Sequence, residues 1–397
     1  MAAPDSVAET PPQPGPDFPR GIGRRIAVAN IGLLPFLLTL PFLYVPKLLE
    51  GDTQPWVLIA AILALFSYRP RLFIQRKDLP VILLGLLALS AYVVRAGLGL
   101  ETLRAAYIFL TFVILWILAN RGGQDWFRVG VRYVLLVWFL VGLYQFLALR
   151  LGFPVSFAGR FIEGRNALPS LTAEPSYFGS LSVVMAMYLL HDRKPGDRWF
   201  VTLATLNVLM SGSLLSVLLL GFLLLYLRFN LKVATAILLA GMLALDGTFN
   251  EAGIVARLAG FQSAGEGLVG VILDPSLNLR IGHVWFTLWS NLLASLAFAH
   301  PIDFQNQYNA FAAGTGVLIP TESNFILPMA GELVYNGGVF GAAIAALLVY
   351  RGGQAGPTSG RRLVRGGFLV ACLLNPISIA NPLLIFYVLQ EKPCRLP

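Results

Sequence analysis

The sequence predicts an all-α, polytopic membrane protein with about twelve transmembrane helices. The chain has 397 residues, of which 57% are hydrophobic and only 12% are charged, whereas a typical soluble domain carries about 25% charged residues. Apolar runs recur along the whole length, and basic residues gather in every second connection between them. Runs of this kind are typical of membrane-spanning helices.

The first 25 residues are expected to form a disordered, cytoplasmic N-terminus, because they are rich in proline and polar side chains up to Pro19. Arginines at 20, 24 and 25 then precede a long apolar run, and no A-x-A cleavage pattern follows it closely. These features predict a start-transfer helix rather than a cleaved signal peptide. We expect a single transmembrane domain over 26–390 and a short cytoplasmic tail over 391–397.

The order of the expected helices follows from the apolar segments. They lie near 27–45, 56–67, 79–94, 104–120, 131–149, 176–190, 199–211, 213–228, 232–247, 325–350, 365–376 and 378–390. Basic clusters occupy alternate connections, at 20–25, 69–77, 121–132, 193–198, 228–232 and 351–365. Because cytoplasmic loops hold an excess of Lys and Arg, these clusters and both termini are expected on the cytoplasmic side.

The segment 199–228 fits either one long helix or two short ones that meet at Ser211-Gly212-Ser213. One helix would place the later basic clusters outside, whereas two helices keep every cluster inside. We therefore expect two helices, and Gly212 suits the tight external turn between them.

Two long loops, at about 150–175 and 248–324, are then expected to face the periplasm or the cell exterior. Within the second loop, an apolar face carries Trp285, Trp289 and Leu293, while Thr287 and Ser295 fall on another face. This periodicity predicts an amphipathic helix lying in the outer membrane interface, since a further span would reverse the orientation of everything after it.

Arginines and carboxylates in the two external loops predict an anion-handling site. The fixed fork of an arginine matches phosphate oxygens, and a carboxylate or a histidine can take the proton of a hydroxyl nucleophile. Simpler roles remain open: lipid-headgroup contacts for the arginines, a helix start for Glu174, an ion pair for Glu332 and an interfacial position for His283. The candidates are Arg160, Arg165, Glu174, Tyr177, Arg257, Arg280, His283, Glu322, Asn324 and Glu332.

Metal and nucleic-acid sites are not predicted. His191, His283 and His300 are far apart, and the two cysteines form no C-x-x-C pair, so the spacing of a metal site is missing. The net charge is +9, but the sequence lacks the pattern of basic and aromatic residues that is typical of a nucleic-acid-binding groove.

Several motifs resemble those of Wzy-type polysaccharide polymerases. After Arg165, the stretch 173–179 (A-E-P-S-Y-F-G) looks like their E-P-S-aromatic-x-G sequence, and Ser211-Gly212-Ser213 looks like their serine-containing turn. The segment 278–316 resembles the large periplasmic loop of the wider O-antigen polymerase/ligase-like group. Glu322-Ser323-Asn324, Glu332 and the stretch 337–341 (G-G-V-F-G) resemble the helix that follows it. The similarity covers about residues 130–350.

The resemblance implies a GT-C-type, metal-independent glycosyltransferase of the bacterial inner membrane, with no cofactor and with its active site facing the periplasm. Its partners would be an undecaprenyl-pyrophosphate-linked glycan and the lipid bilayer, and a chain-length regulator is a further candidate. Arg165 and Arg280 are expected to clamp the diphosphate, Glu174 is the leading base, and Glu332 is second. The expected substrate-binding residues are Arg160, Arg257, Tyr177, His283, Glu322 and Asn324.

Two alternatives remain open at this stage. An O-antigen ligase would transfer finished polymer to lipid A-core, but the position of the ligases' histidine holds Ser323-Asn324 here, which favours the polymerase. A transporter or flippase of lipid-linked oligosaccharides would need charged or helix-breaking sites near the membrane midplane. The polar groups of this chain cluster at the outer ends of the helices instead.

Overall fold

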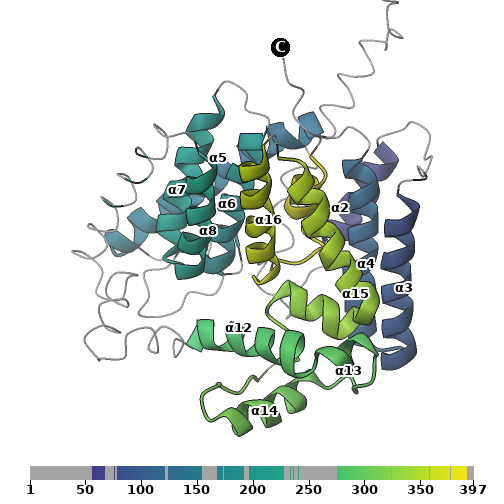
Figure 1. Ribbon diagram of the computed structural model, residues 1–397. Helices are drawn as coiled ribbons and strands as arrows, with labels where there is room; N and C mark the ends of the chain where they lie inside the picture. Colours follow the sequence, from purple (N-terminus) through teal and green to yellow (C-terminus); the bar gives the residue numbers. More distant parts are fainter. Residues whose placement is uncertain are drawn as a thin grey trace, which may run out of the picture.

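The structure of the protein is a computed structural model, and it consists of two helical parts (Figure 1). It describes residues 56–67, 76, 78–120, 124–153, 168–172, 174–191, 196–227, 233, 236, 240, 275–322, 324–356, 358–375 and 377–390. Those residues form helices and turns and no β-strand, so the prediction of an all-α fold is confirmed. A bundle of helices stands above a lower layer of short helices that run across one end of it.

Ten helices make up the described part of the bundle, and each coincides with one predicted apolar segment. They are α2 (Trp56–Ser67), α3 (Leu79–Ala96), α4 (Leu100–Ala119), α5 (Gln124–Arg150), α6 (Pro175–His191), α7 (Asp197–Ser211), α8 (Leu214–Tyr226), α15 (Met329–Gln354), α16 (Ser359–Leu373) and α17 (Pro382–Val388). Within the described ranges, α3, α4, α5 and α15 are long and apolar enough to cross a membrane. The predicted span 27–45 and most of 232–247 lie outside those ranges.

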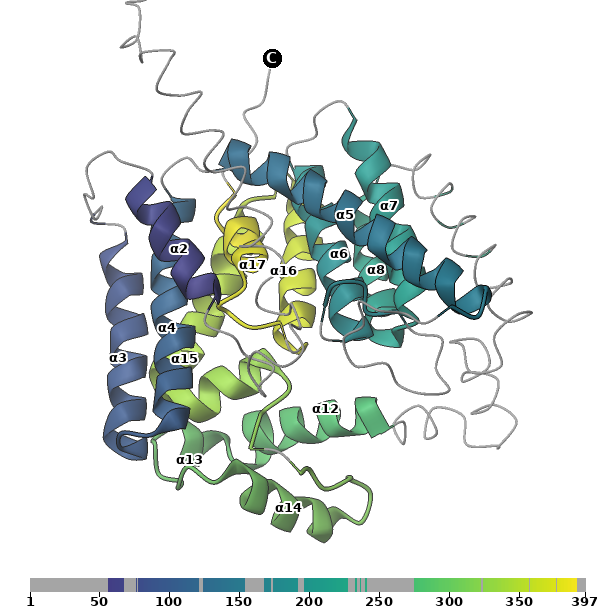
Figure 2. The ribbon, with the colours of Figure 1, turned by 180° about the vertical axis from the view of Figure 1, so that it is seen from behind.

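Helix α6 is the centre of the bundle. All its residues from Phe178 to His191 are buried, and it contacts α5, α7, α8 and α17. Figure 2 shows α5 lying obliquely across α6 and α7. The helix begins at Pro175, where the fixed backbone angle of proline suits the first turn. Glu174 precedes it, and its carbonyl oxygen accepts a hydrogen bond from the Tyr177 amide at 3.1 Å.

A tight turn divides α7 from α8, as predicted. Gly212 adopts the left-handed conformation with φ 58° at the end of α7, and the Ser213 side chain caps α8 by accepting a hydrogen bond from the Ser216 amide. Gly179 of α6 faces this turn. A Cβ atom at Gly179 would lie 2.4 Å from the Ser211 Oγ and 2.5 Å from the Ser216 Oγ, so only glycine permits this approach.

Buried hydroxyl and amide groups tie four helices together beside that contact. The Ser180 Oγ lies 3.1 Å from the Ser216 Oγ and accepts a hydrogen bond of 3.2 Å from the Asn375 Nδ2. The Asn375 carbonyl in turn accepts from the Met329 amide at 3.1 Å. The network therefore links the start of α6 to α8, to the end of α16 and to the start of α15.

Helix α15 is bent, which corrects the prediction of one continuous helix over 325–350. Gly338 has φ 54° and ψ −140°, outside helical values. A Cβ atom at Gly341 would collide with the Leu333 carbonyl, and one at Gly338 would lie 2.2 Å from the Phe298 ring. The first part of α15 runs across the lower end of the bundle, and the second part turns upward into it (Figure 1).

The lower layer contains α12 (Pro275–Trp285), a π-helical turn η1 (Phe286–Ser290), α13 (Leu292–Leu296) and α14 (Phe304–Thr315). The predicted amphipathic segment is helical. Trp289 and Leu293 are each 81% exposed, whereas Thr287 and Ser295 are buried. An apolar face turned outward and a polar face turned inward fit a helix in contact with lipid. Helix α14 was not predicted.

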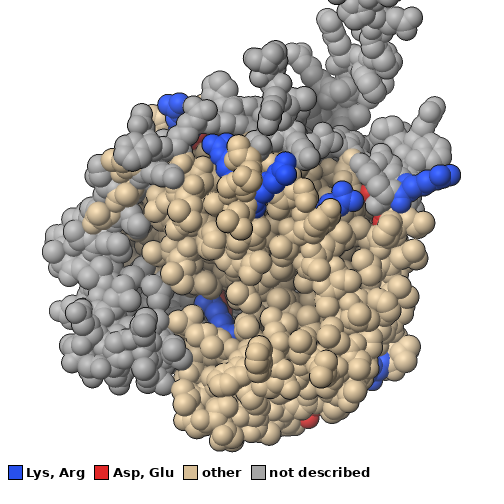
Figure 3. All heavy atoms as spheres, viewed as in Figure 1, with Lys and Arg blue, Asp and Glu red and all other residues tan. Residues whose placement is uncertain are grey.

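Basic side chains gather at the end of the bundle opposite the lower layer (Figure 3). Some of them are interior, which corrects their assignment to loops. Arg128 and Arg132 belong to α5, and both donate to the buried Asp197 carboxylate, at 2.6 Å and 2.5 Å. Arg365 in α16 is also buried, and it bonds the Gly352 and Tyr387 carbonyls.

The Gly179 contact generates a stability prediction. Gly179→Ala should destabilise the protein by about 1–3 kcal/mol, because the added methyl group overpacks the serine turn. We expect a lower melting temperature of the purified protein in detergent. Gly221→Ala in α8 is the matched control, since a Cβ atom there meets nothing within 4 Å. Equal melting temperatures of Gly179→Ala and Gly221→Ala would contradict the close contact.

Candidate functional site

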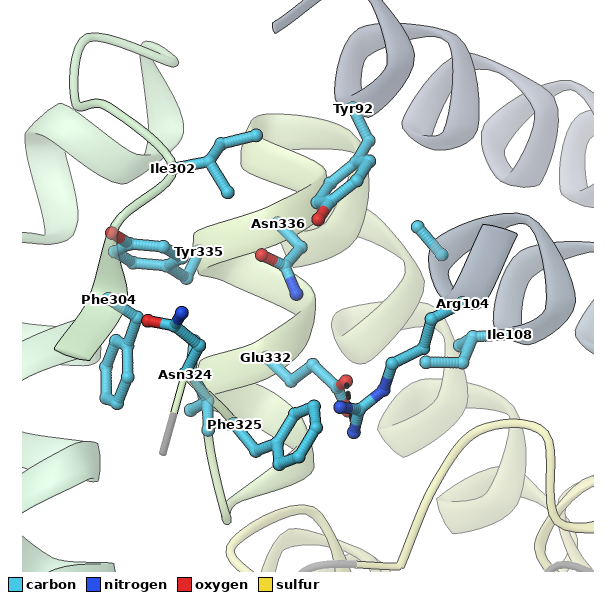
Figure 4. A pocket seen from close by; sticks show the side chains of 12 residues that line it. Tyr92, Arg104, Ile108, Ile302, Phe304, Asn324, Phe325, Glu332, Tyr335 and Asn336 are labelled. Carbon is cyan, nitrogen blue, oxygen red and sulfur yellow. Dashed lines mark ion pairs between the residues drawn. The ribbon is translucent and has the colours of Figure 1, made fainter. Parts of the chain in front are cut away.

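A pocket opens at the lower end of the bundle, between α3, α4 and α15 (Figure 4). Two stretches of the lower layer complete it, one before α14 and one before α15. Its polar lining consists of Tyr92, Arg104, Asn324, Glu332, Tyr335 and Asn336, and its apolar lining of Ala105, Ile108, Ile302, Phe304, Phe325 and Ile326. The pocket is therefore amphipathic, with guanidinium, carboxyl, amide and aromatic groups in its lining.

Arg104 and Glu332 form the charged pair of this pocket. The Arg104 Nη2 lies 3.9 Å from the Glu332 Oε1, which is an electrostatic contact but too long for a hydrogen bond. The guanidinium also stacks over the Phe325 ring, 3.6 Å from its centre. Its Nε is buried, and no described residue accepts a hydrogen bond from it. Both side chains therefore keep unused hydrogen-bonding capacity.

Arg95 and His300 contact the part of α15 that lines the pocket. Arg95 donates to the Tyr335 and Asn336 carbonyls at 3.0 Å and 3.2 Å, and its Nη1 lies 3.4 Å from the His300 Nε2. The His300 ring stacks on Tyr335 at 3.9 Å, and its Nδ1 lies 2.9 Å from the Pro301 carbonyl. Burial lowers the pKa of His300, and nearby Arg95 lowers it further. His300 is thus neutral, with its proton on Nδ1.

His283 lies in the interior of the lower layer, 1% exposed. Its Nδ1 accepts a hydrogen bond from the Leu327 amide at 3.2 Å, and its ring lies between Phe304 and Tyr308 at 4.8 Å and 4.6 Å. Burial lowers the pKa of His283 to about 4. These contacts hold the segment that leads into α15, and they differ from the substrate contact and the interfacial position expected from the sequence.

Glu174 lies at the start of α6, at the same end of the bundle as the pocket. Its Oε2 accepts a hydrogen bond from the Ser176 hydroxyl at 3.3 Å, and its carbonyl accepts one from Thr172 at 2.7 Å. The helix-start role is therefore present in the structure, and the half-buried carboxylate is held beside the first turn. Tyr177 is also half-buried and packs against the main core.

The remaining predicted residues that the structure describes lie around this end. Asn324 and Glu332 line the same pocket, and the Asn324 Oδ1 accepts a hydrogen bond from the Gln305 amide at 3.1 Å. Arg280 is half-buried on α12, and Glu322 is exposed. Arg160, Arg165 and Arg257 lie outside the described residues.

Arg95 and Arg104 were missed by the sequence analysis. Both flank the connection between α3 and α4, close to apolar runs where a charged side chain is costly. That cost is the signal that identifies them, because an arginine is retained at such a position when it has a partner or a function. Here Arg104 faces Glu332, and Arg95 supports the backbone of α15.

Comparisons with known proteins found no similar protein. No family model matches the chain, and neither a curated protein nor a solved structure matches it. Among the described residues, no three His, Cys, Asp or Glu side chains lie together in a way that suits a metal ion.

The buried His283 generates a pH prediction. In the unfolded chain a histidine binds a proton near its ordinary pKa of 6.5, whereas folded His283 binds one only near 4. Acid between these values therefore favours unfolding, by roughly 3 kcal/mol at most. We expect the melting temperature to fall more between pH 7 and pH 4.5 in the wild type than in His283→Gln. An identical acid response would show that His283 is accessible to protons in the folded protein.

Proposed function

We propose that the protein is a polysaccharide polymerase of the bacterial inner membrane. In this proposal it joins undecaprenyl-pyrophosphate-linked repeat units into an O-antigen or exopolysaccharide by metal-independent glycosyl transfer. The chain would cross the membrane about twelve times with both termini in the cytoplasm. The lower layer and the pocket would then lie on the periplasmic side, in the manner of a GT-C-type enzyme.

One observation carries the proposal. The A-E-P-S-Y-F-G stretch and the serine turn, which are far apart in the sequence, pack directly against each other at Gly179. Their contact fixes Glu174 at the end of the bundle that also holds Arg104, Glu332 and the lower layer. Glu174, Arg104 and Glu332 thus lie at the end opposite the basic side chains, where in this proposal a lipid-linked substrate would present its diphosphate at the membrane surface.

The proposed reaction is one displacement at the anomeric carbon of a lipid-linked chain. A hydroxyl oxygen of a second lipid-linked unit forms the new C–O bond, and the bond from the anomeric carbon to the diphosphate breaks. The hydroxyl proton passes to a carboxylate, for which Glu174 is the first candidate and Glu332 the second. Negative charge grows on the leaving diphosphate, and Arg165 and Arg280 are the proposed groups that stabilise it.

The activity is tested with purified protein and lipid-linked repeat unit in detergent, with the product ladder followed on a gel. We expect oligomers from the wild type and about 100-fold less product from Arg280→Ala and Glu174→Gln, because each change removes a group that acts in the transition state. Arg198→Ala is the control, since Arg198 is exposed at the opposite end. A wild type that makes no oligomers would favour a ligase or a transporter instead.

Sidedness is tested separately, in a background with Cys372→Ala and Cys394→Ser. A membrane-impermeant thiol reagent added to intact spheroplasts should label Glu322→Cys and should leave Arg198→Cys unlabelled until the cells are permeabilised. Both positions are exposed and lie at opposite ends of the bundle. The reverse labelling pattern would place the pocket in the cytoplasm and overturn the proposed reaction.

A further inference from the structure

We infer that the pocket between α3, α4 and α15 binds one neutral sugar ring, with Arg104 and Glu332 as its charged hydrogen-bonding pair. The inference rests on the proposed function, because the sugar would be the acceptor end of a lipid-linked glycan. It goes further in assigning the pocket to the sugar rather than to the diphosphate.

The charges of this pocket do not match those of a diphosphate. Among the described residues, Arg104 is the one basic side chain in the lining, and it lies 3.9 Å from Glu332. A diphosphate bound to the Arg104 guanidinium would lie close to the Glu332 carboxyl group and would find no second cation in the lining to balance its charge. A neutral hydroxyl group meets no such penalty. It can donate to the Glu332 carboxylate and accept from the Arg104 guanidinium at the same time.

The distance between the two charged groups also favours a bridging ligand. At 3.9 Å they do not satisfy each other's hydrogen bonds, and the Arg104 Nε has no acceptor among the described residues. Buried donors and acceptors that lack a hydrogen-bond partner destabilise the folded protein. Hydroxyl groups of a bound ring would complete them, as would the water molecules that the ring displaces.

The rest of the lining suits a pyranose. The side chains of Asn324 and Asn336 supply amide groups, and Figure 4 shows Asn336 on α15 between Tyr92 and Glu332. Phe325 is 52% exposed, so its ring supplies apolar surface for the C–H face of a sugar. The cavity of about 50 Å³ has room for a few water molecules, which matches the hydroxyl-bearing edge of one ring.

Ligand-observed saturation-transfer NMR on the purified, full-length protein tests this inference. The probes are the methyl pyranosides of glucose, galactose, mannose, rhamnose and N-acetylglucosamine, with inorganic pyrophosphate as competitor. We expect at least one glycoside to receive saturation from the wild type and to keep it when pyrophosphate is added. Its dissociation constant should rise about tenfold or more in Glu332→Gln, Asn336→Ala and Phe325→Ala.

Asn306→Ala is the matched control for Asn336→Ala, because Asn306 is exposed on α14, outside the pocket lining, and its side chain donates a hydrogen bond to Asp303. It should bind like the wild type, and melting temperatures check that each pocket variant is folded. Three results would overturn the inference: no saturation of any probe, unchanged binding in all three pocket variants, or displacement of the glycoside by pyrophosphate.

These results are distinguishable from failure of the proposed function. Glycoside binding without oligomer formation would keep the sugar site and reject the polymerase. Oligomer formation that is unaffected by all three pocket substitutions, together with no glycoside binding, would keep the polymerase and reject this site.

Discussion

The close approach of α6 to the turn between α7 and α8 is the constraint on which the rest of the structure depends. A helix that is buried on all sides needs neighbours on every face, and Gly179 lets the serine turn come close enough to supply one of them. The serine hydroxyls there must bond within the protein, since an apolar bundle offers them no water. Through Asn375 and the Met329 amide, the same contact fixes where α15 begins.

The charged side chains at the two ends of the bundle differ in how closely they are paired. At the upper end, the buried Asp197 carboxylate accepts from both Arg128 and Arg132 at hydrogen-bond distance, so its charge is paired. At the lower end, Arg104 and Glu332 face each other across 3.9 Å without bonding. The upper network therefore holds α5 against α7, and the lower pair is the one that we propose to bind a ligand.

The periodicity and length of the apolar segments predicted most helices, including the division of α7 from α8. These signals depend only on residues that are close together in the sequence, so they need no knowledge of tertiary contacts. The bend in α15 was not predicted, since it depends on Phe298 and Arg95, which are distant in the sequence. Helix α5 begins earlier than expected, because Asp197 pairs with Arg128 and Arg132. These two arginines, which were predicted to lie in a loop, therefore lie within a helix. Asn324 and Glu332 were identified as candidates, but their partner Arg104 belongs to another helix.

The bend in α15 is also what creates the pocket. A straight helix would use the Tyr335 and Asn336 carbonyls in its own hydrogen bonds and would carry these residues up into the bundle. The break at Gly338 releases both carbonyls, and Arg95 binds them from α3. Their side chains are thereby held at the lower end, where Tyr335 and Asn336 line the pocket beside Glu332. The glycine-rich stretch after Asn336 thus permits the backbone conformation of the bend, and Arg95 stabilises that conformation by binding the released carbonyls.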